Sequence, residues 1–473
     1  MCRSRLGFLP SLLGSLSVCG GVAWAEPIAL PSSEQVITPA SPPQLTVPAD
    51  APIAVGDPEP LTVPTEPLQV RIQATQALSL AEAMARAVEQ NFQVRQAELA
   101  VASAQAALDQ AVAAYAVSAS SGLNYAYSQS ALAPTDSSLL TITLIQLGYL
   151  VLDGGGRDAN LAAAQAGLEI AELTLAQTLQ DVRLQTANAY YALQSADADV
   201  AVRLAAVANA EASLRDAQAQ ERAGISTRFE VLQAETSLAN NRQQLLRAEN
   251  EQRLARRALA TLLNYPLPTD VTATDGILPG ANWDLSLEES ITRAYRNRPE
   301  LEILRRQVAQ ANARTIVALN STAPEVRLGG SLSTGDNLQT SDNWRLGYSL
   351  SATLSYAWGD GGAAEASARQ NRLNAEILTS RFDQTAAGIR QEVEEAYLSL
   401  VSAREQIESA RTAVATANES LRLARLRFQA GVGTQTEVLS AEAALTEAQG
   451  NFSGAIIAYN RSLARLQRAL GIL

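Results

Sequence analysis

Apolar residues recur at seven-residue steps along two long stretches of the chain. The two runs are Leu193, Val200, Val207, Leu214 and Leu400, Ile407, Val414, Leu421, Phe428. A seven-residue repeat predicts helices that supercoil around one another. We therefore expect long helices over residues 157–222 and 363–429. A helix of 66 residues is about 99 Å long, at about 1.5 Å per residue, which is more than a globular domain needs.

Shorter helical stretches accompany the long ones. Residues 78–117 are rich in Ala, Gln and Glu and contain no Gly or Pro, a composition that favours a helix. We expect three more helices over 227–264, 285–320 and 434–470. Placed end to end, two such helices would run beside one long helix.

A second pattern, with a period of two, predicts strands. In residues 344–356 apolar and aromatic side chains occupy the even positions, and the odd positions hold Arg345 followed by small Gly, Ser and Thr residues. Such alternation is typical of a strand with one apolar face. We expect strands near 118–130, 139–152, 325–334 and 343–358. Three groups of residues are each expected to share an apolar face: Val326, Leu328, Leu332; Leu123, Tyr125, Tyr127; and Leu140, Ile142, Leu144.

These elements occur twice, always 207 positions apart. Residues 78–88 match 285–295, and the glycine turns after Asp153 and Asp360 correspond. A period of this length indicates a duplicated unit of domain size. We therefore divide the chain into repeats over 78–264 and 285–473, joined by a proline-containing crossover over 265–284.

Composition excludes most chemistry. The chain of 473 residues has no His, all 36 basic residues are Arg, and both Cys lie in the first 19 residues. Imidazole, lysine and cysteine chemistry is therefore absent from the repeats, and we expect no enzyme, no cofactor and no metal site. The net charge of −12 argues against nucleic acid as a partner.

The first 77 residues differ from the rest. Arg3 and Arg5, an apolar run and then Ala23-Trp24-Ala25 predict a signal peptide over 1–25. Lipidation at Cys19 is the weaker alternative. Residues 26–77 contain 11 of the 18 prolines and predict an extended linker. No later apolar run is long enough for a membrane-spanning helix.

The strands favour a membrane barrel, with a sheet in water as the alternative. Trp344 begins the clearest strand and Tyr356 and Trp358 end it, as aromatic girdles do at membrane interfaces. Four strands cannot close a barrel, so copies of the chain must share one. Two copies would give eight strands and a filled interior, whereas three copies would give twelve strands and a passage. The expected lumen-facing residues are Arg345, Ser349, Ser351 and Thr353; Arg345 either tunes ion preference or lies at the rim.

Two glycine-containing loops end the long helices, at 223–235 and 430–442. In each a glycine can end a helix in the left-handed conformation, and a threonine with a glutamate three residues later forms a capping box. We expect tight helix-to-helix turns at Gly224, Ile225, Ser226, Thr227 and at Gly431, Val432, Gly433, Thr434. Asp153 and Asp360 are interpreted as turn residues rather than metal ligands.

The ordered set of helix, strand pair, "DGG" turn, long helix and "AG" hairpin, found twice, resembles the TolC-like outer-membrane efflux proteins. The resemblance covers residues 78–472. It implies a homotrimer in outer-membrane lipid, with a 12-stranded barrel and a 12-helix periplasmic tunnel. It also implies two partners, an inner-membrane transporter and a periplasmic adaptor that docks at the hairpin turns. Such a duct serves tripartite efflux or type I secretion and catalyses nothing.

The resemblance also implies an aperture at the hairpin turns, with Glu230, Glu437 and Phe428 as candidate residues. The chain departs from some relatives here: Ser440 stands where a second acidic residue occurs, and Phe428 and Gly433 stand where polar partners are expected. The alternative function is a periplasmic coiled-coil adaptor or scaffold whose sheets are soluble. That alternative explains the hairpins but not the apolar strand faces.

Overall fold

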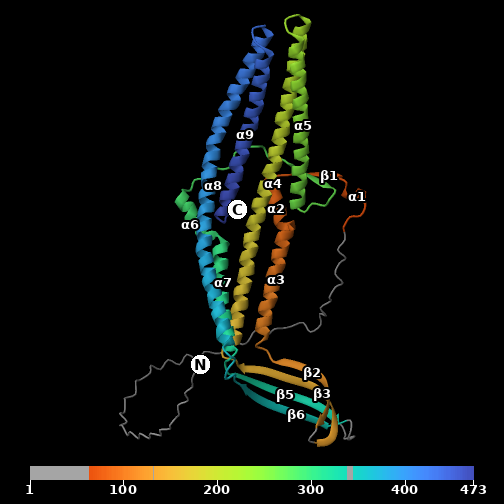
Figure 1. Cartoon of the computed structure of the whole chain (residues 1–473), viewed down its shortest axis with the longest axis vertical. Helices are drawn as coiled ribbons and strands as arrows, with labels where there is room; N and C mark the ends of the chain where they lie inside the picture. Colours follow the sequence, from red (N-terminus) through yellow and green to blue (C-terminus); the bar gives the residue numbers. More distant parts are fainter. Residues whose placement is uncertain (1–62, 131–132, 338–344) are drawn as a thin grey trace, which may run out of the picture. The chain divides into compact units, whose positions relative to one another are not determined.

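The computed structural model describes residues 63–130, 133–337 and 345–473 (Figure 1). The expected signal peptide, Cys19, Trp344 and most of the expected linker lie outside the described residues. The described helices and strands all belong to one unit, which spans residues 64–473.

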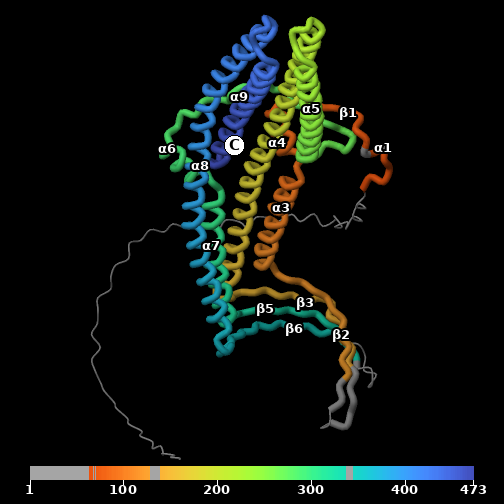
Figure 2. Tube along the Cα trace, turned by 45° about the horizontal axis from the view of Figure 1, so that its top comes forward, coloured from red at the N-terminus to blue at the C-terminus, as the bar shows by residue number. Residues whose placement is uncertain are grey.

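Eight of the described helices form two sets of four. The first set is α2 (Leu80–Gln90), α3 (Phe92–Ala113), α4 (Gly156–Arg222) and α5 (Arg228–Leu262); the second is α6 (Leu287–Asn297), α7 (Pro299–Asn320), α8 (Ala363–Gln429) and α9 (Gln435–Ala469). Every bound in the second set equals its counterpart in the first plus 207. In both sets a long helix runs beside the two short stretches that precede it and the one that follows it (Figure 2). The predicted long helices are therefore confirmed.

The expected helices over 78–117 and 285–320 are wrong as continuous elements, because each is broken once. Asn91 has an extended backbone, and its side chain accepts a hydrogen bond from Gln93 N, which caps α3. In the second repeat the break falls at Arg298, directly before Pro299. Proline disfavours a helical conformation in the residue before it and is tolerated at the first position of a helix. The signal for the second break was therefore present in the sequence.

Part of the expected linker is ordered, which corrects its boundary. Residues Pro67–Val70 form the short helix α1, and Ala74–Leu78 form strand β1. Strand β1 pairs in parallel with β4 (Thr269–Ala273), which lies in the crossover between the repeats. Asp275, just after β4, accepts hydrogen bonds from Leu80 N at 2.7 Å and from the Tyr190 hydroxyl at 2.8 Å. The crossover is thus fixed to α2 and α4. Burial of the Tyr190 hydroxyl raises its pKa to about 12.

A four-stranded antiparallel sheet lies where the long helices begin. Its strands are β2 (Ser118–Ser130), β3 (Ala133–Leu152), β5 (Glu325–Asn337) and β6 (Arg345–Ser355), in the order β2-β3-β5-β6. The central pair, β3 and β5, joins the two repeats, and β2 and β6 form the edges. Among the described helices none is both long enough and apolar enough to cross a membrane.

The strands differ from expectation at their ends and at one bulge. Strand β3 begins at Ala133 rather than near 139, and β6 ends before Tyr356 and Trp358. Leu140 and Ile142 share a face as expected, but the pairing of β3 with β5 shifts between Thr143 and Ile145. A bulge inserts one residue and reverses the alternation. The apolar face therefore continues at Ile145, Leu147 and Tyr149, and the assignment of Leu144 to it is wrong.

Each repeat has its own core, built on the same positions. In the first, Val182, Tyr190, Leu193, Leu259 and Leu263 are fully buried; in the second, Ile389, Leu400, Leu466 and Leu470 play the same part. Along the outer half of α4 the buried residues are small, namely Ala206, Ala210, Ser213 and Ala217. Val200 and Val207, which the seven-residue step places on the buried side of this helix, are only half-buried. Small side chains let the helices approach closely, so the seven-residue step of large residues describes α8 better than α4.

Candidate functional site

The two helix-to-helix turns have the conformation that the sequence predicts. Gly224 and Gly431 have φ values of 74° and 72°, in the left-handed region. The amides that follow them fold back onto the ending helix: Ile225 N donates to Gln220 O and Val432 N donates to Arg427 O. These bonds satisfy the last carbonyl groups of α4 and α8. Each hairpin is therefore closed by a compact turn with a defined geometry.

The two turns differ in their caps and in the space around their third residue. In the first, the Glu230 carboxylate accepts from Thr227 N and from the Ser226 hydroxyl. In the second, Thr434 accepts from Glu437 N, but the Glu437 carboxylate lies 3.7 Å from Arg427 instead of reaching back. The capping box is confirmed only in the first turn.

Gly433 occupies the place of Ser226 for a steric reason. A Cβ atom at this position would lie 3.0 Å from Arg427 Cβ and 3.0 Å from Phe428 N. A contact this tight forces the neighbouring backbone to shift, so a side chain is poorly tolerated there.

We expect Gly431→Ala to destabilise the protein by about 1 kcal/mol, because an alanine at positive φ is strained. Space is not the cause, since the nearest heavy atom to a Cβ there is Ile225 Cγ2 at 3.9 Å. The matched control is Gly454→Ala in the interior of α9, where a Cβ meets nothing within 4 Å. Alanine should stabilise that helix by about 0.5–1 kcal/mol. Thermal unfolding of the two variants should therefore shift in opposite directions, and equal shifts would contradict the backbone argument.

A buried polar network joins the second hairpin to α4 near these turns. The Glu442 carboxylate, 7 % exposed, accepts from the Ser213 hydroxyl at 2.7 Å and from Arg425 at 2.8 Å. Arg425 also donates to the Asn209 side chain at 3.0 Å. Nearer the turn, the Gln220 amide donates to the carbonyl of Phe428 at 2.7 Å. The parts of α4, α8 and α9 nearest the turns are thus held together by one charge-assisted cluster.

The sequence did not single out Glu442 or Arg425. Both lie outside the turns, and the partners Ser213 and Glu442 are 229 positions apart. The one available signal was their position on the seam side of helices rich in alanine. A carboxylate there must be paired to be tolerated.

The three candidate aperture residues have different surroundings. Phe428 is 4 % exposed and packs with Leu421, Val438 and Leu445 between α8 and α9. In the single chain its side chain fills the hairpin core. Glu230 and Glu437 lie near the turns, each at the third position of its helix, where a carboxylate is also favoured by the helix dipole.

The faces of the sheet separate polar from apolar residues. Ser349, Ser351 and Thr353 pair with Ser331, Gly329 and Arg327 on β5, and Arg345 pairs with Gly335, which makes one polar face. The Ser331 and Ser349 hydroxyls are 2.8 Å apart. The other face is apolar and unusually bare: Tyr348 and Leu350 are 84 % exposed, and Leu346 and Leu354 are 66 % and 68 % exposed. An apolar surface of this kind indicates contact with lipid or protein.

The two aspartate turns between sheet and helices hold their helices rather than a ligand. Asp153 accepts from Gly155 N and Arg157 N, and Asp360 accepts from Gly362 N and Ala364 N. These backbone N–H groups, first that of Ala364, lower the pKa of Asp360. Over the described residues no three metal-ligating side chains gather in one place.

A second charged cluster lies where the C-terminal end of α9 meets the break between α6 and α7. Arg298, whose side chain is 4 % exposed, donates to Glu300 at 3.0 Å and to Glu392 at 2.7 Å. Arg468 donates to Glu300 and, across the repeats, to Asp181. Both arginines are thus held by carboxylates on other helices, and the cluster fixes α4 against α9.

The chain matches known proteins over both repeats. The family described as "Outer membrane efflux protein" matches residues 83–265 and 290–472. Protein CyaE of Bordetella pertussis is 28 % identical over 306 residues, which are 64 % of this chain and 64 % of CyaE. The pyoverdine export outer membrane protein OpmQ of Pseudomonas aeruginosa is 25 % identical over 69 % of this chain and 68 % of its own.

Solved structures agree in fold. The outer membrane protein VceC of Vibrio cholerae superimposes with a TM-score of 0.71 and 19 % identity, over 83 % of this chain and 96 % of that one. At this identity the likeness concerns the fold. Since the family matches both repeats, which make up most of the sequence, the chain belongs to the outer membrane efflux protein family.

Proposed function

We propose that the protein is a homotrimeric exit duct in the outer membrane, serving a tripartite efflux pump or a type I secretion system. The observation that carries the proposal is the sheet with one bare apolar face and one polar face, joined to helices of 67 residues. Such helices are about 100 Å long, at about 1.5 Å per residue. Each repeat contributes two strands to the sheet and one long helix.

The number of copies is inferred from the strands. A sheet with open edges is not tolerated in lipid, because unpaired backbone groups there cost several kcal/mol each. Four strands per chain in three copies give a twelve-stranded barrel with a passage, and the polar face with Ser349, Ser351 and Thr353 would line it. Arg345 stands at the first position of its strand and would lie near one mouth of the barrel.

The partners are inferred from the family and the turns. We place the periplasmic adaptor at the two turns, around Gly224 and Gly431, and an inner-membrane transporter beyond it as the source of energy. The relative OpmQ is named as an outer membrane protein for pyoverdine export. The cargo of this chain would be set largely by its transporter.

The alternative, a periplasmic adaptor or scaffold, accounts for the helical hairpins alone. It leaves Tyr348 and Leu350 exposed to water with no reason for their apolar character. The observed sheet therefore favours the duct.

The test is to extract the protein from outer membranes in mild detergent, measure its mass and record single-channel conductance in planar bilayers. We expect three copies per particle and discrete conductance steps. A monomer in the periplasmic fraction that gives no conductance would instead support the adaptor.

A further inference from the structure

The long helix α8 leaves bare the faces that its counterpart α4 buries. Helix α4 packs against α3 and α5 of its own repeat and also against α7 and α9 of the other. Helix α8 packs against α6, α7 and α9, all of its own repeat. In the part of the chain that the structure describes, neither α3 nor α5 packs along α8 to a comparable extent. One half of the repeat contact is therefore missing from the single chain.

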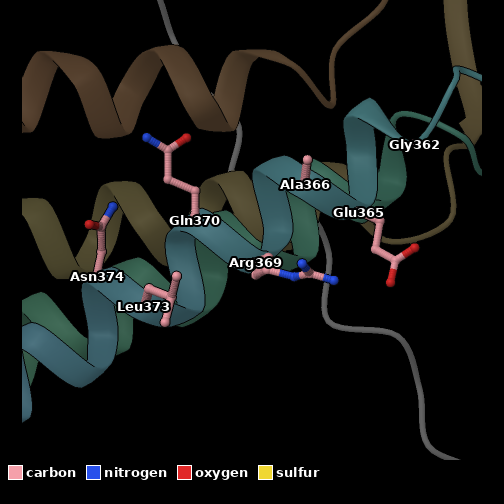
Figure 3. Close-up of a pocket in the computed structure, with 7 residues that line it drawn as sticks. All are labelled: Gly362, Glu365, Ala366, Arg369, Gln370, Leu373 and Asn374. Carbon is pink, nitrogen blue, oxygen red and sulfur yellow. The ribbon is translucent and has the colours of Figure 1, made fainter.

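Individual side chains show the same difference. Four residues of α4 that are buried against other helices have exposed counterparts 207 positions later on α8: Ala159, Ala166, Ala206, Ser213 and Ala366, Leu373, Ala413, Ser420. Ala166 is 8 % exposed, whereas Leu373 is 51 % exposed. Ala366 and Leu373 line a hollow of about 530 Å³ at the start of α8 (Figure 3). A leucine at such a position needs a cover.

Two polar contacts of α4 have the same residue types at the corresponding positions of α8. Ser213 binds Glu442 of α9; the counterparts are Ser420, which is exposed, and Glu235 of α5, which is half-buried. Arg183 donates to the carbonyl of Leu473 at 2.7 Å. Its counterpart is Arg390, whose side chain is 65 % exposed and donates to Glu394 of its own helix. The carbonyl that corresponds to Leu473 O belongs to Pro266.

The helix ends that present these groups also match. Helices α5 and α9 are each followed, two positions after their last residue, by a residue of positive φ: Asn264 at 49° and Gly471 at 72°, which are 207 positions apart. The backbone that brings Leu473 to Arg183 is therefore repeated at Pro266. The second contact needs only a partner helix in the right place.

We propose that a second copy of the chain covers this face of α8 with its α3 and α5. Ser420 of one copy then binds Glu235 of the next, and Arg390 of one copy binds the carbonyl of Pro266 of the next. This inference rests on the proposed oligomer and adds the residues that join its members. The contact is head-to-tail, since α8 of each copy meets α3 and α5 of its neighbour. Repeated contacts of this type form a ring when the rotation between neighbours closes, and the three copies of the proposed barrel require that closure.

The strands show the same relation between a contact within the chain and its counterpart between copies. Within the chain, β3 of the first repeat pairs with β5 of the second. Their counterparts are β6 and β2, which are the two open edges. The edge of β6 therefore pairs with β2 of the next copy, and no backbone edge remains open.

The contact around Glu442 within one chain and the proposed contact around Glu235 between copies differ in strength. Arg425, which neutralises Glu442 inside the chain, corresponds to Gln218, and Asn209 corresponds to Thr416. The contact between copies thus offers Glu235 a hydroxyl and an amide but no guanidinium. A guanidinium adds the attraction between opposite charges to its hydrogen bonds with a carboxylate, which a hydroxyl or an amide does not. The junction between copies is accordingly the weaker one near the turns.

The test uses paired cysteines and a short bis-maleimide cross-linker on the full-length protein in its membrane. For Ser420→Cys with Glu235→Cys we expect adducts of two and three times the chain mass. The matched control, Ser213→Cys with Glu442→Cys, joins residues within one chain and should stay at the mass of one chain. The unchanged chain, with Cys2 and Cys19 in its expected leader, sets the background.

Failure of this inference is distinguishable from failure of the duct. A particle of three copies whose Ser420→Cys, Glu235→Cys variant gives only single-chain adducts would overturn the residue assignment and leave the duct standing. A monomer by mass would overturn both. Replacing the buried Glu442 in the control pair can itself disturb the fold. A further variant therefore carries a photo-cross-linking residue at the exposed position 420 alone. Its adducts must map to α5 of another chain, and adducts that map elsewhere, or their absence, would reject the contact.

Discussion

Leu350→Arg should abolish assembly of the protein in the outer membrane. Leu350 is 84 % exposed on the apolar face of β6, in the middle of the strand. An arginine at the midplane of a bilayer costs a barrel about 2–4 kcal/mol, and the three copies of a trimer would each carry one. The measurement is the amount of oligomer recovered from outer membranes.

The matched control is Ser351→Arg, one residue further along the same strand. Successive side chains of a strand point to opposite faces, so this arginine lies on the polar face with Thr353 and Arg327. We expect normal assembly with altered ion preference. If both variants assembled equally well, the apolar face would not be in lipid, and the adaptor would become the better explanation.

The second large effect is expected for Arg298→Ala. Removing this buried side chain leaves the carboxylate of Glu300, which is 15 % exposed, with one fewer cation, and leaves the carbonyl of Ala469 without its donor. Breaking a buried ion pair from one side costs about 3–5 kcal/mol, and because Glu392 is 55 % exposed we take the lower figure, about 3 kcal/mol. The measurement is the thermal midpoint of the purified protein.

Arg296→Ala serves as the control for Arg298→Ala. It removes the same side chain two residues earlier, where the residue is exposed at the end of α6. Exposed substitutions of this kind change stability by about 0.5 kcal/mol or less. Equal midpoints for the two variants would show that the cluster around Arg298 contributes nothing beyond an ordinary surface pair.

The repeat offset made most of the architecture predictable from the sequence. A seven-residue step, a two-residue step and one constant spacing located the long helices, the strands and both turns to within a few residues. The glycines of positive φ were also predictable, because Gly224 and Gly431 follow long helical patterns and precede capping residues. These features depend on neighbours in the chain.

Features that depend on distant partners were missed. Strand β4 exists because it pairs with β1, whose residues are separated from it by nearly two hundred positions. The bulge near Leu144 depends on the register against β5, which no pattern within β3 reveals. Phe428 is both a position of the seven-residue step and a residue beside a turn, and only the packing of α9 shows that its side chain is buried. The helix break before Pro299 differs from these features, because it depends only on a neighbouring residue.

The contacts between repeats also fix an order of events during folding. Ser213 can form its hydrogen bond only when Glu442, 229 positions later, is available. Gln180 and Arg183 likewise need carbonyl groups that lie 291 and 290 positions later. Contacts of such high sequence separation form late, because closing a long loop precedes any gain from it. The buried side of α4 therefore stays uncovered until nearly the whole chain is available to fold. A chain with this topology leaves that surface exposed to aggregation for longer than a chain with local contacts alone.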